Sequence, residues 1–335
     1  MPHNSGLTCH RVSMSRFSIV YDRFLIAMLA TVGLAMLLPA SGAVAESLHA
    51  VSTLAIALLF FLHGARLPRE AIVAGLTHWR LHLLVLAVTF VFFPLLGIAI
   101  KHALPPAWIG SELMLGVLFL SALPSTVQSS IAFTSMAHGN VAAAVCSASL
   151  SNLAGVLLTP LLAACLLGGN GETSLSVNAL TRIVLQLALP FVAGHLARPW
   201  LARWLERRRS LLAWTDRGTA LLVVYLAISA SVIEGLWRQL PFTSLTALFL
   251  IVGAILATAL LFTHCLSLRL GFKREDRIAI VFCGSKKSLA SGVPIANVLF
   301  AGNPALGMIV LPVLIYHQIQ LIACAVIAQR YARQH

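Results

Sequence analysis

Long apolar runs, separated by short polar breaks, follow one another along almost the whole chain. A helix needs about 20 residues, each rising 1.5 Å, to cross the hydrocarbon core of a bilayer. Breaks rich in proline, glycine or charge separate the runs, as at residues 105–106, 168–171 and 302–304. The pattern predicts ten transmembrane helices, at residues 24–39, 45–64, 81–100, 112–137, 140–167, 179–197, 218–234, 243–268, 277–300 and 304–328.

Composition is that of a single membrane domain. Hydrophobic residues make up 59% of the 335 residues and charged residues 10%, whereas soluble domains carry about 25% charged residues. We therefore expect a cytoplasmic N-terminal segment at 1–20 and one transmembrane domain at 21–330. The first 20 residues lack an apolar stretch followed by a small-residue cleavage site, so we expect no removable signal peptide. Translation could start at Met1 or Met14.

The basic residues favour every second loop. If both termini face the cytoplasm, all but five of the 23 lysines and arginines lie in cytoplasmic segments; the exceptions are Lys101, Arg182, Arg238, Lys286 and Lys287. This asymmetry follows the positive-inside rule and predicts an even number of spans in the inner membrane, with both termini cytoplasmic. The net charge of +13 does not indicate nucleic-acid binding, because the basic residues sit in short loops and form no face.

Two of the ten runs are themselves interrupted by polar residues. The fourth contains PSTVQSS at 124–130, and the ninth contains GSKKS at 284–288. Ten spans divide into two sets of five, and because five is odd the second set enters the membrane in the opposite orientation. Interrupted helices at matching positions of two inverted halves are the best sequence pointer to a transporter binding site.

Both interruptions lie near the middle of the membrane. Lys287 is ten residues into the ninth run, which places it about 15 Å deep if the run is helical. Each break creates a helix N-terminus, near Gln128 and near Ser288, which favours anions, while the preceding helix ends offer carbonyls that favour cations.

The adjacent Lys286 and Lys287 need a partner at that depth. A charged lysine there costs about 2.5–3.5 kcal/mol on insertion scales, and no acidic residue lies at the same depth. Neutral oxygens, water, loss of the proton or a bound anion could compensate, and we prefer an anionic substrate. One alternative is that the ninth helix starts later and the lysines snorkel to the surface. For the serines, Thr126, Gln128 and Asn152, the alternative is contact between helices.

The chain resembles a known family at these residues. PSTVQSS, HGNVAAAV, SNLAGVLLTPLL and CGSKKSLASGVP, in this order, resemble the bile acid:sodium symporter family, and more narrowly its SBF-like branch, over about residues 21–330. The resemblance implies ten helices in two inverted five-helix repeats, with discontinuous helices 4 and 9 crossing. It implies a panel of spans 1, 2, 6 and 7, a core of spans 3, 4, 5, 8, 9 and 10, and alternating access.

The same resemblance implies two sodium ions at the crossing, but the residues match only in part. Ser129 and Ser130 fall at the family's ligand pair on span four, and Thr89 falls near a span-three glutamine. The span-nine glutamate has no counterpart, because Phe282 or Cys283 stands there, and the two lysines occupy the places of a glutamine and an asparagine. A lysine beside a cation position repels Na⁺, so coupling to Na⁺, to protons or to no ion stays open.

We therefore expect a secondary transporter of a small organic anion. The candidate substrate- or ion-binding residues are Thr89, Thr126, Gln128, Ser129, Ser130, Asn152, Lys286, Lys287 and Ser288. A channel or a non-transporting regulator of ion handling is the alternative; an intramembrane enzyme is disfavoured because no carboxylate lies at depth. The six cysteines form no CxxC pair and the histidines show no ligand spacing, so neither a metal site nor a cofactor is expected, with Na⁺ as a coupling ion the exception left open.

Overall fold

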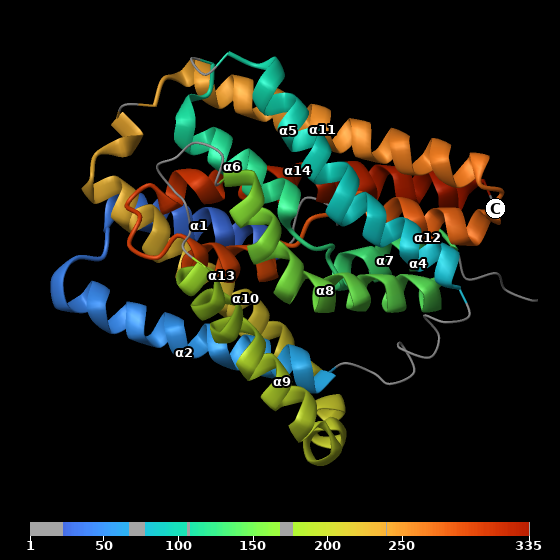
Figure 1. Cartoon of the computed structure of the whole chain (residues 1–335), viewed down its shortest axis with the longest axis horizontal. Coiled ribbons are helices and arrows are strands. Elements are labelled where there is room, and N and C mark those ends of the chain that lie inside the picture. The colour runs from blue at the N-terminus through green and yellow to red at the C-terminus, as the bar shows by residue number, and fades with distance from the viewer. Residues whose placement is uncertain (1–22, 67–77, 106–107, 168–176, 239, 335) are drawn as a thin grey trace, which may run out of the picture.

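A computed structural model describes residues 23–66, 78–105, 108–167, 177–238 and 240–334 (Figure 1). Within these ranges the chain is helical and contains no strand. The predicted N-terminal segment at 1–20 and the predicted break at 168–171 lie outside the described residues.

Helix occupies each of the ten predicted runs. The elements are α1 (Arg23–Leu37), α2 (Gly42–Arg66), α4 (Trp79–Ala87), the π-helix η1 (Val88–Phe92), α5 (Phe93–Ala103), α6 (Gly110–Ala122), α7 (Gln128–Met136), α8 (Val141–Leu167), α9 (Val177–Arg207), α10 (Arg209–Ile233), the short η3 (Leu236–Arg238), α11 (Phe242–Arg269), α12 (Arg274–Gly284), α13 (Leu289–Leu299) and α14 (Leu306–Arg333).

The boundaries differ most around the arginine-rich segment. Helix α9 continues ten residues beyond its predicted end, and α10 begins nine residues before its predicted start. Arginine is a good helix former, so both helices extend into the basic segment and the break between them narrows to Arg208.

In the described part of the chain, seven helical segments are long and apolar enough to cross a membrane. They are Gly42–Ala65, Trp79–Ala103, Val141–Leu166, Leu212–Ile233, Phe242–Arg269, Arg274–Leu299 and Leu306–Arg333. Ile26–Leu37 and Gly110–Ala122 are apolar but shorter. These lengths and compositions are those of a multi-pass membrane protein, while the count of ten spans stays a prediction.

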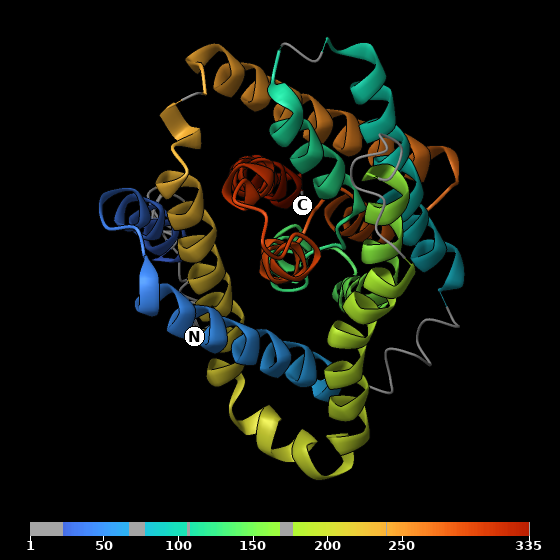
Figure 2. The same ribbon diagram turned by 60° about the vertical axis from the view of Figure 1, so that its left-hand side comes forward.

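Four helices, α1, α2, α9 and α10, pack on one another along one side of the molecule. Helix α2 packs on α9 and α10, and α1 packs on α10. Figure 2 shows α2 in blue and α10 in gold beside the centre, where α13 and α14 lie in orange to red. Helix α10 contacts both central helices, so it joins this side to the remainder of the fold.

Both predicted interruptions are present as breaks between helices. Helix α6 ends at Ala122 and α7 begins at Gln128, while α12 ends at Gly284 and α13 begins at Leu289. Leu123 is extended, with ψ 151°, as expected for a residue before a proline. Ser288 caps α13, because its Oγ accepts a hydrogen bond from the Ser291 N–H at 3.2 Å. We call the meeting of residues 123–127 with 285–288 the helix crossing.

Candidate functional site at the helix crossing

The two breaks contact each other directly through hydrogen bonds. The Ser288 N–H donates to the Pro124 carbonyl at 2.8 Å. The hydroxyl of Ser125 donates to the Cys283 carbonyl at 2.5 Å, and that of Ser130 donates to the Phe282 carbonyl at 3.1 Å. The last carbonyls of α12 have no partner in their own helix, so side chains from the other break satisfy them.

The buried ammonium of Lys287 contacts three main-chain oxygens. Its Nζ lies 2.9 Å from the Thr89 carbonyl, 2.8 Å from that of Ser121 and 2.7 Å from that of Leu123. We call these three oxygens the carbonyl cage. An ammonium has three donors and no acceptor, so the cage satisfies Lys287 completely. Neutral oxygens, one of the options left open by the sequence, therefore partner this lysine.

Local backbone features free the three cage oxygens. In the π-helix η1 the Phe93 N–H bonds to the Val88 carbonyl, and the next residue, Pro94, has no N–H to offer. The Thr89 carbonyl therefore has no helical partner. Ser121 and Leu123 lie at the end of α6, where carbonyls are unpaired and the helix dipole is negative.

Thr89 contributes its main-chain carbonyl to the site, and not its side-chain hydroxyl. Its hydroxyl donates to the Val85 carbonyl of its own helix at 2.7 Å, while its carbonyl oxygen belongs to the cage. The residue was found from the sequence, but the sequence gives no sign that its backbone supplies the contact.

Lys286 points into aromatic surroundings and not into the cage. Its Nζ is buried and has no hydrogen-bond partner in the described structure. It lies 3.9 Å from the ring centre of Phe133 on α7 and 5.8 Å from that of Phe282 on α12, a cation–π arrangement for a protonated amine. Lys286 is 0% exposed and Lys287 1%, so the snorkelling alternative is wrong.

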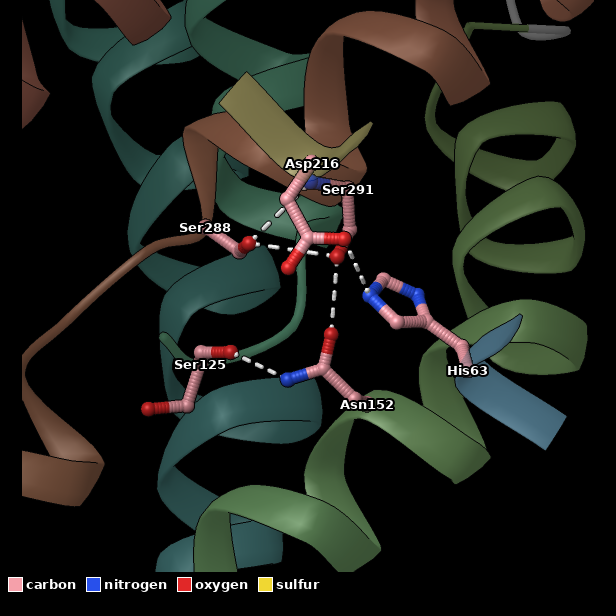
Figure 3. A network of polar contacts seen from close by, with 6 residues as sticks. All are labelled: His63, Ser125, Asn152, Asp216, Ser288 and Ser291. Atoms are coloured by element: carbon pink, nitrogen blue, oxygen red, sulfur yellow. Dashed lines mark hydrogen bonds and ion pairs between the residues drawn. The ribbon is translucent and has the colours of Figure 1, made fainter. Parts of the chain in front are cut away.

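Asn152 on α8 connects the two breaks (Figure 3). Its Nδ2 donates to the Ser125 carbonyl at 2.7 Å, and its Oδ1 accepts from the Ser291 hydroxyl at 2.8 Å. Ser291 in turn accepts from the Ser288 hydroxyl at 3.2 Å. Ser291 is absent from the residues predicted from the sequence. It could have been found from its position, because it is a polar residue inside an apolar segment, three residues after the cap Ser288.

The remaining predicted residues lie at the start of α7. The Thr126 hydroxyl is 2.8 Å from that of Ser129 and 3.0 Å from that of Ser130. Gln128 is exposed on the same turn, and its side chain makes no hydrogen bond in the described structure. The crossing thus brings together all the predicted residues except Gln128, which stands apart from these contacts.

Helix α14 contributes two polar side chains that the sequence-based set omits. The Tyr316 hydroxyl donates to the Ser285 carbonyl at 2.6 Å, and Gln320 contacts the backbone of Lys287. Both are buried. Both could have been found from the sequence as single polar residues inside an apolar helix, although such residues also serve ordinary packing between helices.

One histidine–carboxylate pair lies near the same region. His63 Nε2 on α2 is 3.2 Å from Asp216 Oδ1 on α10, and Figure 3 shows the pair in the same view as Asn152 and Ser291. Asp216 is the one buried acidic residue in the described ranges. The predicted seventh run at 218–234 leaves Asp216 outside it, whereas the structure places Asp216 seven residues after the start of α10.

A sodium ion cannot share the cage with the Lys287 ammonium. A free cation there would occupy the position of the Lys287 ammonium and would be repelled by it. At the place where the resemblance implies a glutamate, Phe282 and Cys283 offer carbonyls that already accept hydrogen bonds from Ser130 and Ser125.

Comparison with known proteins agrees with the resemblance seen in the sequence. The model of the SBF-like CPA transporter family matches residues 22–333. "Uncharacterized protein PA2026" of Pseudomonas aeruginosa is 58% identical, over 96% of each chain. "Putative symporter YfeH" of Escherichia coli K12 is 48% identical over 94% of each chain. "Sodium/bile acid cotransporter 7" of Rattus norvegicus is 29% identical over 91% of this chain and 90% of that protein. The chain belongs to the SBF-like CPA transporter family, a membrane transporter family of the bile acid:sodium symporter type.

Proposed function

We propose that this protein is a secondary transporter that moves a small organic anion across the inner membrane by alternating access. The observation that carries the proposal is the helix crossing, where two unwound segments meet with two buried lysines. Irregular backbone at membrane depth is tolerated where it is buried in protein or lines a cavity, and it is a recurrent feature of transporter binding sites. Relatives named symporter and sodium/bile acid cotransporter support a transporter and not an enzyme.

The proposed architecture is ten spans in two inverted repeats of five. Spans 4 and 9 are α6–α7 and α12–α13, which carry the two breaks. Helices α1, α2, α9 and α10 form the panel, and the other helices form the core. The mutual packing of these four helices supports that division. Both termini are cytoplasmic in this arrangement, as the distribution of basic residues indicates.

The proposed anion site lies at the crossing, beside the N-termini of α7 and α13. The helices α7 and α13 begin there, and their N-termini favour negative charge. The polar groups at hand are Thr126, Gln128, Ser129, Ser130, Asn152 and Ser288. Lys286 has no hydrogen-bond partner in the described structure and supplies positive charge that an anionic substrate balances when the core moves. Bile acids, named for the rat relative, are one class of such anions.

Transport in proteoliposomes tests this function. Purified protein is reconstituted, and uptake of radiolabelled carboxylates and sulfonates, taurocholate among them, is measured with and without the same unlabelled anion inside. A carrier shows saturable uptake that is accelerated by internal substrate, and Lys286→Ala lowers it. Tyr225→Phe, which removes a hydrogen bond to the Leu38 carbonyl on the panel, serves as the control and transports normally. Uptake that rises linearly with concentration, or no uptake of any anion, contradicts the proposal.

A further inference from the structure

The carbonyl cage has the chemistry of a site for a monovalent cation. Three main-chain oxygens, from Thr89 on η1, Ser121 on α6 and Leu123 at its end, converge on one point at 2.7–2.9 Å. The negative end of the α6 dipole adds to their field. On the remaining side the ring centre of Phe93 lies 4.0 Å from the same point, which attracts a cation through the ring quadrupole.

The cation at that point belongs to the protein itself. From this geometry we infer that the Lys287 ammonium is a built-in cation, which fills the cage permanently and makes a free sodium ion unnecessary there. Lys287 is thus an internal ligand, and this role does not depend on the proposed transport of an anion.

Attachment to the chain gives the ammonium an advantage over any free ion. A tethered group acts at an effective concentration in the millimolar range or above. The Lys287 backbone is also held in place, because its N–H and carbonyl both bond to Gln320 at 2.9 Å. Within the described ranges no carboxylate lies at the crossing to attract a second cation, so like-charge repulsion keeps other ions out.

The neighbouring lysine provides a matched comparison. Lys286 is equally buried, carries the same charge and lies in the same break, but its Nζ contacts aromatic rings and no carbonyl cage. Removing Lys287 therefore opens a place for a small cation, whereas removing Lys286 does not.

Thermal unfolding in different salts tests the inference without a substrate. Wild type, Lys287→Ala, Lys287→Met and Lys286→Ala are melted in detergent with sodium, potassium, ammonium or tetramethylammonium chloride, each at about 100 mM. Lys287→Met retains most of the side-chain volume and leaves the ammonium position open, so it tests the same vacancy if the alanine variant does not fold.

We expect the wild type to melt at the same temperature in all four salts. Loss of the Lys287 ammonium lowers the melting temperature by about 5–10 °C when it is measured in tetramethylammonium chloride. At least one of sodium, potassium and ammonium then restores about half of that loss. Lys286→Ala shows no such restoration. The inference is overturned if sodium specifically stabilises the wild type, or if both Lys287 variants respond to small cations no more than Lys286→Ala does.

Discussion

Gln320 on α14 pairs both ends of its side-chain amide with the backbone of Lys287. Its Oε1 accepts from the Lys287 N–H at 2.9 Å, and its Nε2 donates to the Lys287 carbonyl at 2.9 Å. The unwound residue thereby receives the two hydrogen bonds that a helix would otherwise supply. All these groups are buried, and the bilayer offers no substitute for them.

Replacing Gln320 by leucine should destabilise the protein strongly. The change leaves the Lys287 N–H and carbonyl unpaired, at a cost of about 1–3 kcal/mol for each group. Thermal unfolding in detergent measures the effect. Gln318→Leu on the same helix is the control, because Gln318 is only partly buried and makes no side-chain hydrogen bond in the described structure. Equal melting temperatures for the two variants would show that the pairing contributes little.

Tyr316→Phe tests a second support of the same break. It removes the hydroxyl that donates to the Ser285 carbonyl at 2.6 Å. The buried carbonyl is then unpaired, which lowers the stability of the protein by about 1–3 kcal/mol. In Tyr225→Phe the lost hydrogen bond, to the Leu38 carbonyl at 2.8 Å, lies outside the buried interior, so the change leaves no enclosed carbonyl unpaired and the melting temperature stays close to that of the wild type. A larger loss in Tyr225→Phe than in Tyr316→Phe would contradict this account.

Two glycines set the close approach of α2 and α9. A Cβ at Gly64 would overlap the Phe191 carbonyl, and a Cβ at Gly194 would overlap the Phe61 carbonyl. Alanine at either position must push the helices apart, at a cost of about 1–3 kcal/mol or more. Gly253→Ala is the control, since no atom lies within 4 Å of the added Cβ and alanine favours helix by up to about 1 kcal/mol. Unfolding temperatures that fall equally for all three variants would refute the packing argument.

The sequence predicts the scaffold well because membrane helices obey few and strong rules. Every apolar run became helix, and proline with neighbouring polar residues placed the first break at Pro124. Counting along the ninth run also placed Lys286 and Lys287 well inside that run, and the structure buries both side chains within the protein.

The orientation of side chains at the crossing could not be predicted in the same way. Lys286 and Lys287 are adjacent in sequence but end in an aromatic pocket and in a carbonyl cage, respectively. The cage consists of main-chain atoms, which carry no residue-specific signature, and its Thr89 carbonyl is freed by a π-helix that no composition rule indicates. Asp216 falls outside the predicted run at 218–234 because the apolar pattern marks where a helix becomes hydrophobic, and α10 begins before that point.

Asn152 offers a test of where the anion binds. Asn152→Asp retains the size and the acceptor for the Ser291 hydroxyl but places negative charge beside the proposed site, so the apparent affinity for the transported anion should fall roughly tenfold or more, equivalent to about 1.4 kcal/mol. Asn303→Asp is the control, because Asn303 caps the turn before α14 through Ala305 N–H and aspartate caps equally well. Concentration-dependent uptake in proteoliposomes measures both. Unchanged affinity in Asn152→Asp would move the anion site elsewhere.

Lys286 should affect transport and stability in opposite directions. Its buried amine has no hydrogen-bond partner in the described structure, and burying a polar group without a hydrogen bond costs about 1–3 kcal/mol, a cost that an apolar side chain of similar size avoids. Lys286→Met should therefore melt at the same temperature as the wild type or above it, whereas Lys287→Met, which empties the cage, melts below it. Uptake of an anion by Lys286→Met should nevertheless fall, because the positive charge that attracts the anion is gone. Melting curves and uptake measured on the same preparations separate the two effects. A stable Lys286→Met that transports as well as the wild type would remove this lysine from the binding site.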